Sequence, residues 1–564
     1  MTALSFVFAF VLMLGVLIFV HELGHFLVAK LFDVKVLRFS LGFGPPIGIG
    51  PWKLAFRRGE TEYLAAWFPL GGFVKMVGES PDPGGEEGEG EEVLAPGEEH
   101  RAFNRKPVWQ RLLILFAGPA MNLLLPVLIF ATVLLIGMPR PAAVVGTVEA
   151  ASPAERAGIQ VGDRVLAIAG EPVRWWDGVE EAVRTRAGET VAVELERGGE
   201  TIELALPIEA RSGLDEYGSS AQVGFAGLGH LRMAPVLGIP GADAPATRAG
   251  LRSGDRVESV DGEPVEDWSQ LASRYAQARS EARLEVERAG PPDAEPERIE
   301  LRVPALGSLD ALGVVPATVL VAQISPDSPA ERAGLQPGDL IVAVDGRPVG
   351  SFASFSELVR ASNGRPLEIV TARAGERREL RIAPERKEAD TGLGIPEERW
   401  LIGITAQAAA VQGTMGVDRV TNPLGAIARA AGMTADLTRT FLGGFSRIVT
   451  GEVSRKQLAG PIGIAEIAHS AFERGWQAYL STLVLISINL AILNLLPIPM
   501  LDGGQALLIA VEGVKRSPLS LRTRELVQQV GITFLVMLMA LAFWNDLSRH
   551  WRTFVDWVRQ SAGL

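Results

Sequence analysis

Three ionisable side chains follow a long apolar stretch near the beginning of the chain. The segment HELGH places His21, Glu22 and His25 directly after MTALSFVFAFVLMLGVLIFV, which contains no charged residue. On a helix, positions i and i+4 share one face, so the two imidazoles can point at one ion while Glu22 lies beside them. This is the arrangement of a zinc hydrolase, in which two histidines bind the metal and a carboxylate takes a proton from bound water.

The apolar surroundings favour one of two interpretations of this motif. HExxH also occurs by chance, in which case the imidazoles would simply lie on a helix surface. In hydrocarbon, however, an unpaired charged group costs on the order of several kcal/mol, so a cluster of ionisable side chains needs a common partner. A metal ion is such a partner, and two of the six histidines of the chain lie here. We therefore expect His21 and His25 to bind zinc and Glu22 to act as general base.

A catalytic zinc takes a third protein ligand and keeps an open position for water. The candidate is Asp502, which follows a late apolar stretch, INLAILNLLPIPML. Pro497 and Pro499 interrupt the helix before it, and irregular backbone at membrane depth is tolerated only where protein or a cavity satisfies it. Asn489 and Asn494 could satisfy that backbone or bind the backbone of a substrate. The alternative for Asp502 is a helix cap at the membrane interface.

The composition indicates a chain that combines membrane spans with a large soluble part. Its 564 residues are too many for one core, 48% of them are hydrophobic, and the mean hydropathy is +0.21. The net charge of −12 argues against nucleic acid as a partner. The absence of cysteine excludes disulfide bonds and thiolate metal sites, and it leaves the compartment open.

Four stretches are long and apolar enough to cross a bilayer, which takes about 20 residues. Basic residues are concentrated in 30–111 and 515–524, which places these loops in the cytoplasm and the segment between the second and third spans outside. The first stretch leads into charged residues rather than a small-residue cleavage site, so we expect a retained span and not a signal peptide. The expected transmembrane helices are residues 1–31 with HExxH, 112–138, 478–505 with the Asp502 motif, and 526–545.

The segment between the second and third spans contains an internal repeat. Each copy predicts a short helix, a Gly-Asp turn and a strand. The pattern resembles PDZ domains in a circularly permuted form and places three of them at residues 143–235, 236–318 and 319–408. A PDZ groove binds peptide C-termini or extended segments by strand addition, and the alternative is a set of spacers with unoccupied grooves. The aligned stretches are SPAERAGIQVGDRVLAIAGEPV from Ser152, APATRAGLRSGDRVESVDGEPV from Ala244 and SPAERAGLQPGDLIVAVDGRPV from Ser328.

Two further segments have a distinctive composition. Residues 78–100, GESPDPGGEEGEGEEVLAPGEEH, are acidic and rich in Gly and Pro, and they predict a flexible cytoplasmic insert. Residues 422–477 begin with apolar side chains at helical spacing and scattered arginines, and they predict an amphipathic region at the membrane surface.

Together these motifs resemble the site-2 protease family of intramembrane zinc metalloproteases, and most closely its bacterial RseP-type members. HExxH in the first span and NxxPxPxLDG in a late span carry the resemblance, which extends over most of the chain. RseP-type enzymes usually have two PDZ domains, whereas this chain has three and an acidic insert, so the way PDZ domains screen substrates does not transfer directly. Further shared motifs are FSLGFGP (39–45), FPLGGFVKM (68–76), HRAFNRKPVWQR (100–111), AGPAMN (117–122) and GEVSRKQLAGPIGIA (451–465).

The resemblance implies a mechanism and a set of site residues. Zinc held by His21, His25 and Asp502 would activate a water molecule. Glu22 would take the proton and later pass one to the leaving amine. The unwound substrate would add as a strand to a membrane-associated β-structure at about residues 53–76, within the cytoplasmic loop 32–111. The residues expected to contact the substrate are Gly71, Gly72, Asn489, Asn494, Pro497 and Pro499.

The same resemblance implies substrates and a location. Single-pass transmembrane proteins such as anti-sigma factors, already shortened outside by another protease, would be cleaved, and remnant signal peptides are the alternative class. The protein would lie in the bacterial inner membrane, with periplasmic PDZ domains and an active site near the cytoplasmic side. We thus expect a multi-span α-helical membrane protein with a membrane-associated β-structure and inserted tandem α+β PDZ domains.

Two rival functions belong to other classes. A zinc transporter would also place metal ligands within the membrane, but four spans without a visible inverted repeat are few for transport. A catalytically inactive PDZ scaffold would have no use for Glu22. Chelator-sensitive cleavage of a transmembrane substrate separates the protease from both.

Overall fold

The computed structural model divides into two compact units. The helical unit contains residues 1–137 and 419–564, and the repeat unit contains residues 138–390 and 396–418. The residues that the structure describes are 3–49, 52–79, 97–149, 151–214, 220–289, 295–373, 375–390, 396–407, 410–450, 460–517 and 519–562.

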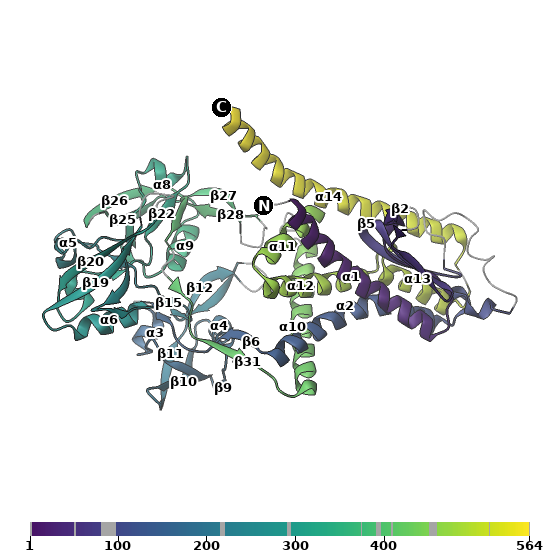
Figure 1. Ribbon diagram of the computed structural model, residues 1–564, viewed down its shortest axis with the longest axis horizontal. Coiled ribbons are helices and arrows are strands. Elements are labelled where there is room, and N and C mark those ends of the chain that lie inside the picture. The colour runs from purple at the N-terminus through teal and green to yellow at the C-terminus, as the bar shows by residue number, and fades with distance from the viewer. Residues whose placement is uncertain are drawn as a thin grey trace. The chain divides into compact units, whose positions relative to one another are not determined.

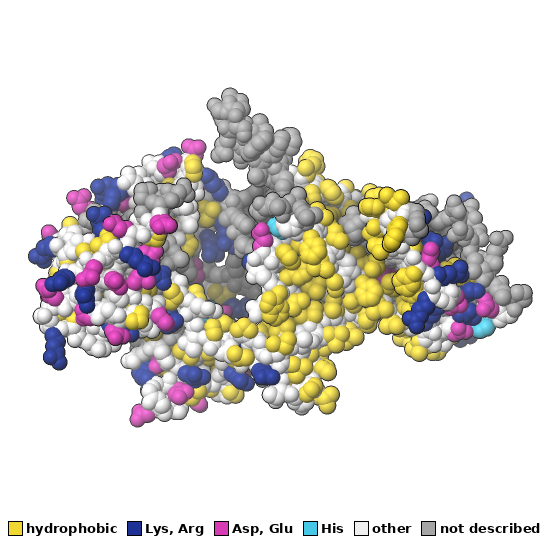
Figure 2. Space-filling view, viewed as in Figure 1, with side chains coloured by type: hydrophobic (Ala, Val, Ile, Leu, Met, Phe, Trp, Pro, Cys, Tyr) yellow, Lys and Arg dark blue, Asp and Glu magenta, His cyan; other side chains and the backbone are white. Residues whose placement is uncertain are grey.

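Helices dominate the helical unit (Figure 1), and four of them are long and apolar enough to cross a membrane. Hydrophobic side chains cover much of the visible face of this unit (Figure 2), as lipid contact requires. Phe8, Phe19 and Leu27 of its first helix are exposed. The candidate spans are Ser5–Leu31, Val108–Ile136, Trp476–Leu495 and Arg522–Leu547. The helices are α1 Ala3–Leu31, η1 Glu99–Arg101, η2 Phe103–Arg105, α2 Val108–Ile136, α10 Pro423–Thr450, α11 Pro461–Glu473, α12 Trp476–Leu495, α13 Asp502–Lys515 and α14 Leu521–Ala562.

The third span is shorter than the expected helix at 478–505. α12 ends at Leu495, because Pro497 and Pro499 cannot continue a helix, and a new helix, α13, begins at Asp502. The expected range therefore covers two helices joined by residues 496–501. The other spans also differ at their ends, since α2 begins directly after a proline and α14 extends well beyond 526–545.

The region expected at the membrane surface, residues 422–477, packs against the spans. Ala430 of α10 and Leu134 of α2 belong to one buried cluster, and Ala468 of α11 and Leu17 of α1 belong to another. Small alanine side chains allow the helices to approach each other closely. This region is therefore part of the helix bundle in the described part of the chain.

Parts of two expected segments lie outside the described residues. These parts are 80–96 of the acidic insert and 451–459 of the shared motif at 451–465. At the described end of the insert, Glu98 accepts a hydrogen bond from Lys35 Nζ at 2.8 Å. That end of the insert is thus tied to the loop after α1.

The β-structure of the helical unit begins before the expected residue 53. Its strand β5 bends back, so β1 pairs with both arms of it: Leu41 lies opposite Ala65 in one arm and Gly72 in the other. Residues 72–76 of β5 form an outer edge, with which no further strand pairs in the described part of the chain. The strands are β1 Val36–Pro46, β2 Gly48–Ile49, β3 Trp52–Lys53, β4 Ala55–Arg58 and β5 Thr61–Met76.

The repeat unit contains three successive copies of one pattern. The first copy comprises β7 Thr147–Val148, α3 Pro153–Arg156, β8 Arg164–Ile168, β9 Glu171–Pro172, α4 Trp176–Arg184, β10 Thr190–Arg197, β11 Glu200–Pro207, β12 Glu209–Leu214, β13 Ser220–Phe225 and β14 Leu228–Gly229. The second comprises β16 Leu237–Gly238, α5 Pro245–Arg248, β17 Arg256–Val260, β18 Glu263–Pro264, α6 Trp268–Gln277, β19 Glu281–Arg288, β20 Glu297–Pro304, α7 Leu309–Leu312 and β21 Val315–Pro316. The third comprises β22 Val321–Ile324, α8 Pro329–Arg332, β23 Leu340–Val344, β24 Arg347–Pro348, α9 Phe352–Ala361, β25 Leu367–Arg373, β26 Glu376–Ile382, β27 Glu385–Asp390, β28 Pro396–Leu401 and β29 Ile404–Ala406.

Each copy has its own hydrophobic cluster and the same four-stranded antiparallel sheet. The strand orders β11-β10-β8-β9, β20-β19-β17-β18 and β26-β25-β23-β24 are equivalent. A longer helix buries one apolar face against each cluster, as Leu271 and Tyr275 of α6 show. The three clusters fall within 143–235, 236–318 and 319–408, and the copies have the α+β composition expected of PDZ domains.

A buried ion pair explains the Gly-Asp turn of the repeat. Asp339 is fully buried, and both of its oxygens accept hydrogen bonds from Arg373, at 2.6 and 2.8 Å. The backbone N–H of Gln336 also donates to this carboxylate, at 2.9 Å. The hydrogen bond to Asp339 raises the pKa of the Arg373 guanidinium. The same pair recurs in the other copies as Asp163–Arg197 and Asp255–Arg288.

The segment after the third copy returns along the repeat unit. It pairs in turn with the third copy, with the connection between the first and second copies, and with the strand that enters the unit. Arg140 of the entering strand binds the fully buried Asp418 of the returning one at 3.1 Å. The ends of the unit are thus joined to each other. The pairs are β29 with β22, β30 Ala410–Val411 with β15 Arg232–Met233, and β31 Met415–Asp418 with β6 Met138–Pro141.

Candidate metal centre

Two helices of the helical unit bring three potential metal ligands together. α1 presents His21 and His25 one turn apart, and α13 contributes its first residue, Asp502. His21 Nε2 lies 3.1 Å from Asp502 Oδ2, and His25 Nε2 lies 3.5 Å from Asp502 Oδ1. One ligand atom from each residue lies within 4.8 Å of the others. The structure therefore places the three sequence-predicted ligands in one cluster.

The turn before α13 aims Asp502 at the histidines. The LDGG sequence makes this turn tight: a Cβ atom at Gly503 would lie 2.3 Å from the carbonyl oxygen of Leu495, and one at Gly504 would lie 2.0 Å from that of Ile498. Asp502 is the first residue within α13, whose N-cap position is Leu501, and its carboxylate faces the two imidazoles. The interface helix cap that the sequence left open for Asp502 is therefore absent.

The donor atoms converge without satisfying one another. The Nε2 atoms of His21 and His25 face each other at 3.1 Å, a position in which at most one proton can lie between them. Oδ2 of Asp502 is buried, and its neighbour at 3.1 Å, His21 Nε2, can bond it only when that nitrogen carries a proton. Buried polar atoms normally have partners, and one ion would satisfy all three side chains at once. Two imidazole nitrogens and one carboxylate oxygen are a donor set that zinc accepts.

Glycines allow the neighbouring helix α2 to approach the cluster. A Cβ atom at Gly118 would lie 2.3 Å from His25 Nε2, and one at Gly24 would lie 2.3 Å from the carbonyl oxygen of Ala117. On the far side of the ring, His25 Nδ1 lies 2.8 Å from the carbonyl oxygen of Ile114. Sequence reasoning missed these positions, although the AGPAMN motif contains Ala117 and Gly118.

The side chain of Glu22 lies between α1 and the β-structure. It is buried, and a Cβ atom at Gly72 would lie 2.9 Å from Glu22 Cγ. Gly71 has a φ of +141°, a conformation that favours glycine, and it packs against the ring of Phe43. The structure thus brings Gly72, at the edge of β5, to the candidate general base.

The four other predicted substrate contacts make no polar contact with the cluster in the described chain. Asn489 and Pro497 are exposed, Asn494 and Pro499 are half-buried, and none of the four makes a hydrogen bond to the three ligands within the described chain. Pro499 packs near Gly531 of α14, where an added Cβ atom would lie 2.8 Å away. These residues stay predictions as substrate contacts.

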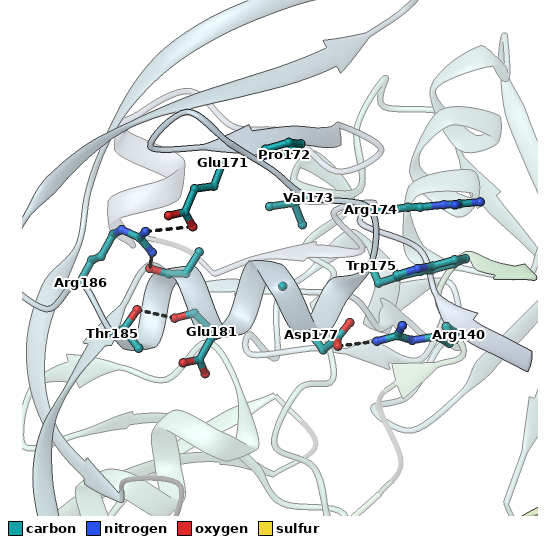
Figure 3. Close-up of a pocket in the computed structure, with 12 residues that line it drawn as sticks. Arg140, Glu171, Pro172, Val173, Arg174, Trp175, Asp177, Glu181, Thr185 and Arg186 are labelled. Atoms are coloured by element: carbon teal, nitrogen blue, oxygen red, sulfur yellow. Dashed lines mark hydrogen bonds and ion pairs between the residues drawn. The ribbon is translucent and has the colours of Figure 1, made fainter. Parts of the chain in front are cut away.

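A pocket of about 460 Å³ lies in the repeat unit, outside the unit that contains the cluster. It is lined mainly by α4 and the loop before it (Figure 3). Two of its arginines are paired, Arg140 with Asp177 and Arg186 with Glu171, and Arg174 lies over the ring of Trp175. Val173 and Trp175 add apolar surface. The pocket combines no nucleophile with a base, so the metal cluster remains the candidate for catalysis.

Comparison with known proteins agrees with this geometry. The description "Peptidase family M50" matches residues 9–538. The regulator of sigma-E protease RseP of Escherichia coli (strain K12) is 31% identical over 543 residues, which cover 96% of this chain and 98% of that protein. Protease RseP of Yersinia pestis is 31% identical over 545 residues, which cover 96% and 98%. A relative in Xylella fastidiosa (strain Temecula1), named as a candidate zinc metalloprotease, is 33% identical over 535 residues, which cover 94% and 96%.

Both the family match and these relatives extend over nearly the whole chain, including both predicted metal-binding motifs. The apolar helices make the protein membrane-embedded. The chain belongs to peptidase family M50 and is a zinc metalloprotease.

Proposed function

We propose that the protein is an intramembrane endopeptidase that cleaves single-pass transmembrane proteins within or near the bilayer. The observation that carries the proposal is the convergence of three potential ligands, with Glu22 beside them. His21, Glu22 and His25 lie on α1, which is long and apolar enough to span a membrane, and Asp502 begins α13 shortly after the third candidate span. A soluble hydrolase would have no reason to place three ionisable groups in such a helix, because their burial in hydrocarbon is costly.

The chain's own residues have distinct roles in the proposed reaction. His21, His25 and Asp502 hold zinc, which supplies Lewis acidity and a water of lowered pKa when bound. Glu22, next to His21 on α1, would accept a proton from such a water and would pass one to the leaving amine. The buried setting keeps other water away and strengthens these interactions.

The edge of β5 is the proposed substrate platform. A transmembrane helix hides its peptide bonds, so a substrate must unwind before attack. Residues 72–76 offer an unpaired strand edge within the described chain, and Gly72 at its start lies against Glu22. An extended substrate added to this edge would carry its backbone past the general base. Asn489, Asn494, Pro497 and Pro499 would line the opposite side, with Gly71 shaping the turn.

The substrate class and the location follow from the resemblance. The E. coli relative is named a regulator of sigma-E protease, and we infer that anti-sigma factors of the bacterial inner membrane are substrates here as well. The basic loops support an orientation in which the β-structure and active site lie near the cytoplasm and the repeat unit lies in the periplasm. There the three copies would bind peptide C-termini or act as a size filter. Clearance of remnant signal peptides is the second candidate function.

The test uses purified full-length protein in detergent or liposomes with a model single-pass substrate. The proposal predicts a cleavage product within the transmembrane segment that disappears with a zinc chelator and returns when zinc is added. A binding scaffold would retain the substrate uncut, and a transporter would move zinc across liposomes without a product. Absence of any chelator-sensitive product from several single-pass substrates would contradict the proposal.

A further inference from the structure

The amide of Asn122 on α2 lies against the outer side of His21. This residue is fully buried, and its Nδ2 lies 3.2 Å from His21 Nδ1, the ring nitrogen that does not face Asp502. Its other polar atom, Oδ1, is buried without a hydrogen-bond partner among the described residues. An orphaned buried amide oxygen beside a predicted metal ligand calls for a physical explanation.

Asn122 belongs to one stripe of α2 that touches both predicted histidine ligands. The carbonyl oxygen of Ile114 contacts His25 Nδ1 at 2.8 Å. Gly118, one turn later, leaves room for both imidazoles, and Asn122 follows after another turn. The stripe therefore contacts the outer nitrogen of each ring, opposite the nitrogens that converge on Asp502.

The chemistry of a histidine ligand fixes which way the amide points. A ring nitrogen that binds a metal must carry a lone pair, so with His21 bound through Nε2 the proton lies on Nδ1. Nδ1–H then donates and needs an acceptor. The oxygen and nitrogen of an amide exchange places by a half-turn about the last side-chain bond, and which atom occupies which place is an assignment. That half-turn places Oδ1 against His21 Nδ1–H and turns the NH2 group to the place that has no partner among the described residues.

We propose that Asn122 is a positioning residue for the metal, whose Oδ1 accepts the hydrogen bond of His21 Nδ1–H and holds the ring with Nε2 toward the ion. The inference rests on the proposed zinc site. The Ile114 carbonyl does the same for His25 but can only accept. An amide can also donate. Asn122 can therefore hydrogen-bond His21 in both states: it accepts from Nδ1–H when zinc is bound, and it donates to Nδ1 when zinc is absent and that nitrogen carries the lone pair.

The test measures zinc affinity rather than turnover. Full-length protein in detergent is stripped of zinc, and its zinc dissociation constant is measured by competition with a chromophoric chelator. Asn122→Leu keeps the volume and removes both polar atoms, and it is expected to weaken zinc binding about 10–100-fold. Asn122→Asp keeps an acceptor and is expected to bind zinc at least as tightly as the unaltered protein. Cobalt loaded in place of zinc should show altered visible absorption bands in Asn122→Leu alone.

Two matched variants separate positioning from packing. Ser487→Ala removes the hydroxyl that donates to the backbone oxygen of Asn122, at 2.7 Å, and Thr482→Val removes another buried hydroxyl of α12. Both are expected to keep the zinc affinity. Thermal unfolding of zinc-free Asn122→Leu should not be lowered, since an incompletely bonded buried amide is replaced by an apolar group.

The remaining arm tests the zinc site itself with Asp502→Asn. Unchanged zinc affinity in that variant would overturn the site and the proposal with it. If Asp502→Asn binds zinc more weakly while Asn122→Leu keeps its zinc affinity, only the role of Asn122 is overturned. A third outcome would show a packing role and contradict positioning. In that outcome, Asn122→Leu binds zinc more weakly and also loses thermal stability, and Ser487→Ala binds zinc more weakly to the same degree.

Discussion

Buried carboxylates in the two units have opposite surroundings. In the repeat unit, both oxygens of Asp339 are bonded to Arg373, and a backbone N–H adds a further bond. In the helical unit, Asp502 faces two imidazoles, and one of its oxygens is buried without a hydrogen bond in the described chain. The first carboxylate is paired with a permanent cation, and the second lies against two imidazoles that can also bind a metal.

This difference separates a structural group from a functional one. Removing one partner of a satisfied buried pair leaves the other charge without compensation, so such a pair contributes to folding. A converging but unsatisfied set has binding capacity left for an ion, and it carries a stability cost until that ion is bound. The same substitution, Asp to Asn, should therefore have different consequences in the two units.

The largest effect is expected at Glu22, the one acidic side chain of the site that is not a predicted ligand. Glu22→Gln should reduce cleavage of a model substrate by about 10²–10⁴-fold, because an amide cannot accept the proton of water. Zinc content should stay unchanged, since His21 and His25 are intact. Substantial remaining turnover in a reconstituted assay would sink the assignment of Glu22.

Asp502→Asn should lower both zinc content and cleavage. An amide oxygen is a weaker donor than a carboxylate and brings no charge to offset the ion. The zinc-free variant should unfold no more easily than the zinc-free parent, since its parent carboxylate is unsatisfied. Metal analysis and thermal unfolding of purified protein check both points. Normal zinc occupancy together with normal cleavage would mean that the third ligand lies elsewhere.

Asp339→Asn should show the reverse pattern. We expect it to lower the free energy of unfolding of the third copy by about 2–3 kcal/mol, because Arg373 loses its charged, doubly bonded partner but is partly exposed to water. Amide hydrogen exchange of full-length protein should become faster in β23 and β25, whereas zinc content should not change. If exchange in these strands is unaffected, the pair is not a stabilising element of the copy.

The smallest effect on chemistry is expected from removing the three copies. Deletion of about residues 143–408 leaves β6 and β31 to pair with each other at the junction. If the copies act as a size filter, the deleted enzyme should cleave an intact substrate that the full-length enzyme rejects. It should also cleave a trimmed version at an unchanged rate. Equal slowing of both substrates would instead indicate a role in folding or binding.

The sequence predicted the elements whose signals are local. The i, i+4 histidines of HELGH needed only one helix, and the prolines before Asp502 marked the break that starts α13. The partner of Asp339 was missed, because Arg373 lies far along the chain and no short pattern links the two. An arginine at the end of the same strand in all three copies was the available signal.

Close approaches between separate segments could not be read from the sequence. The contacts of Gly118 with the imidazoles and of Gly72 with Glu22 depend on how α2 and β5 pack against α1. The bend in β5 that makes residues 72–76 an edge was likewise missed, although Pro69 and Gly71-Gly72 were the available signal. Asn122 belonged to a shared motif, yet its contact with His21 appears only when the helices are assembled.

Zinc K-edge X-ray absorption of the purified full-length protein tests the central claim most directly. The account predicts about one zinc ion per chain, with two imidazole nitrogens at about 2.0–2.1 Å and carboxylate oxygen at about 2.0–2.2 Å. Glu22→Gln should give the same nitrogen shell, and Asp502→Asn should lose zinc or its carboxylate oxygen. A zinc spectrum without imidazole ligands would contradict the account. So would a spectrum that stays the same as that of the unaltered protein in both His25→Ala and Asp502→Asn.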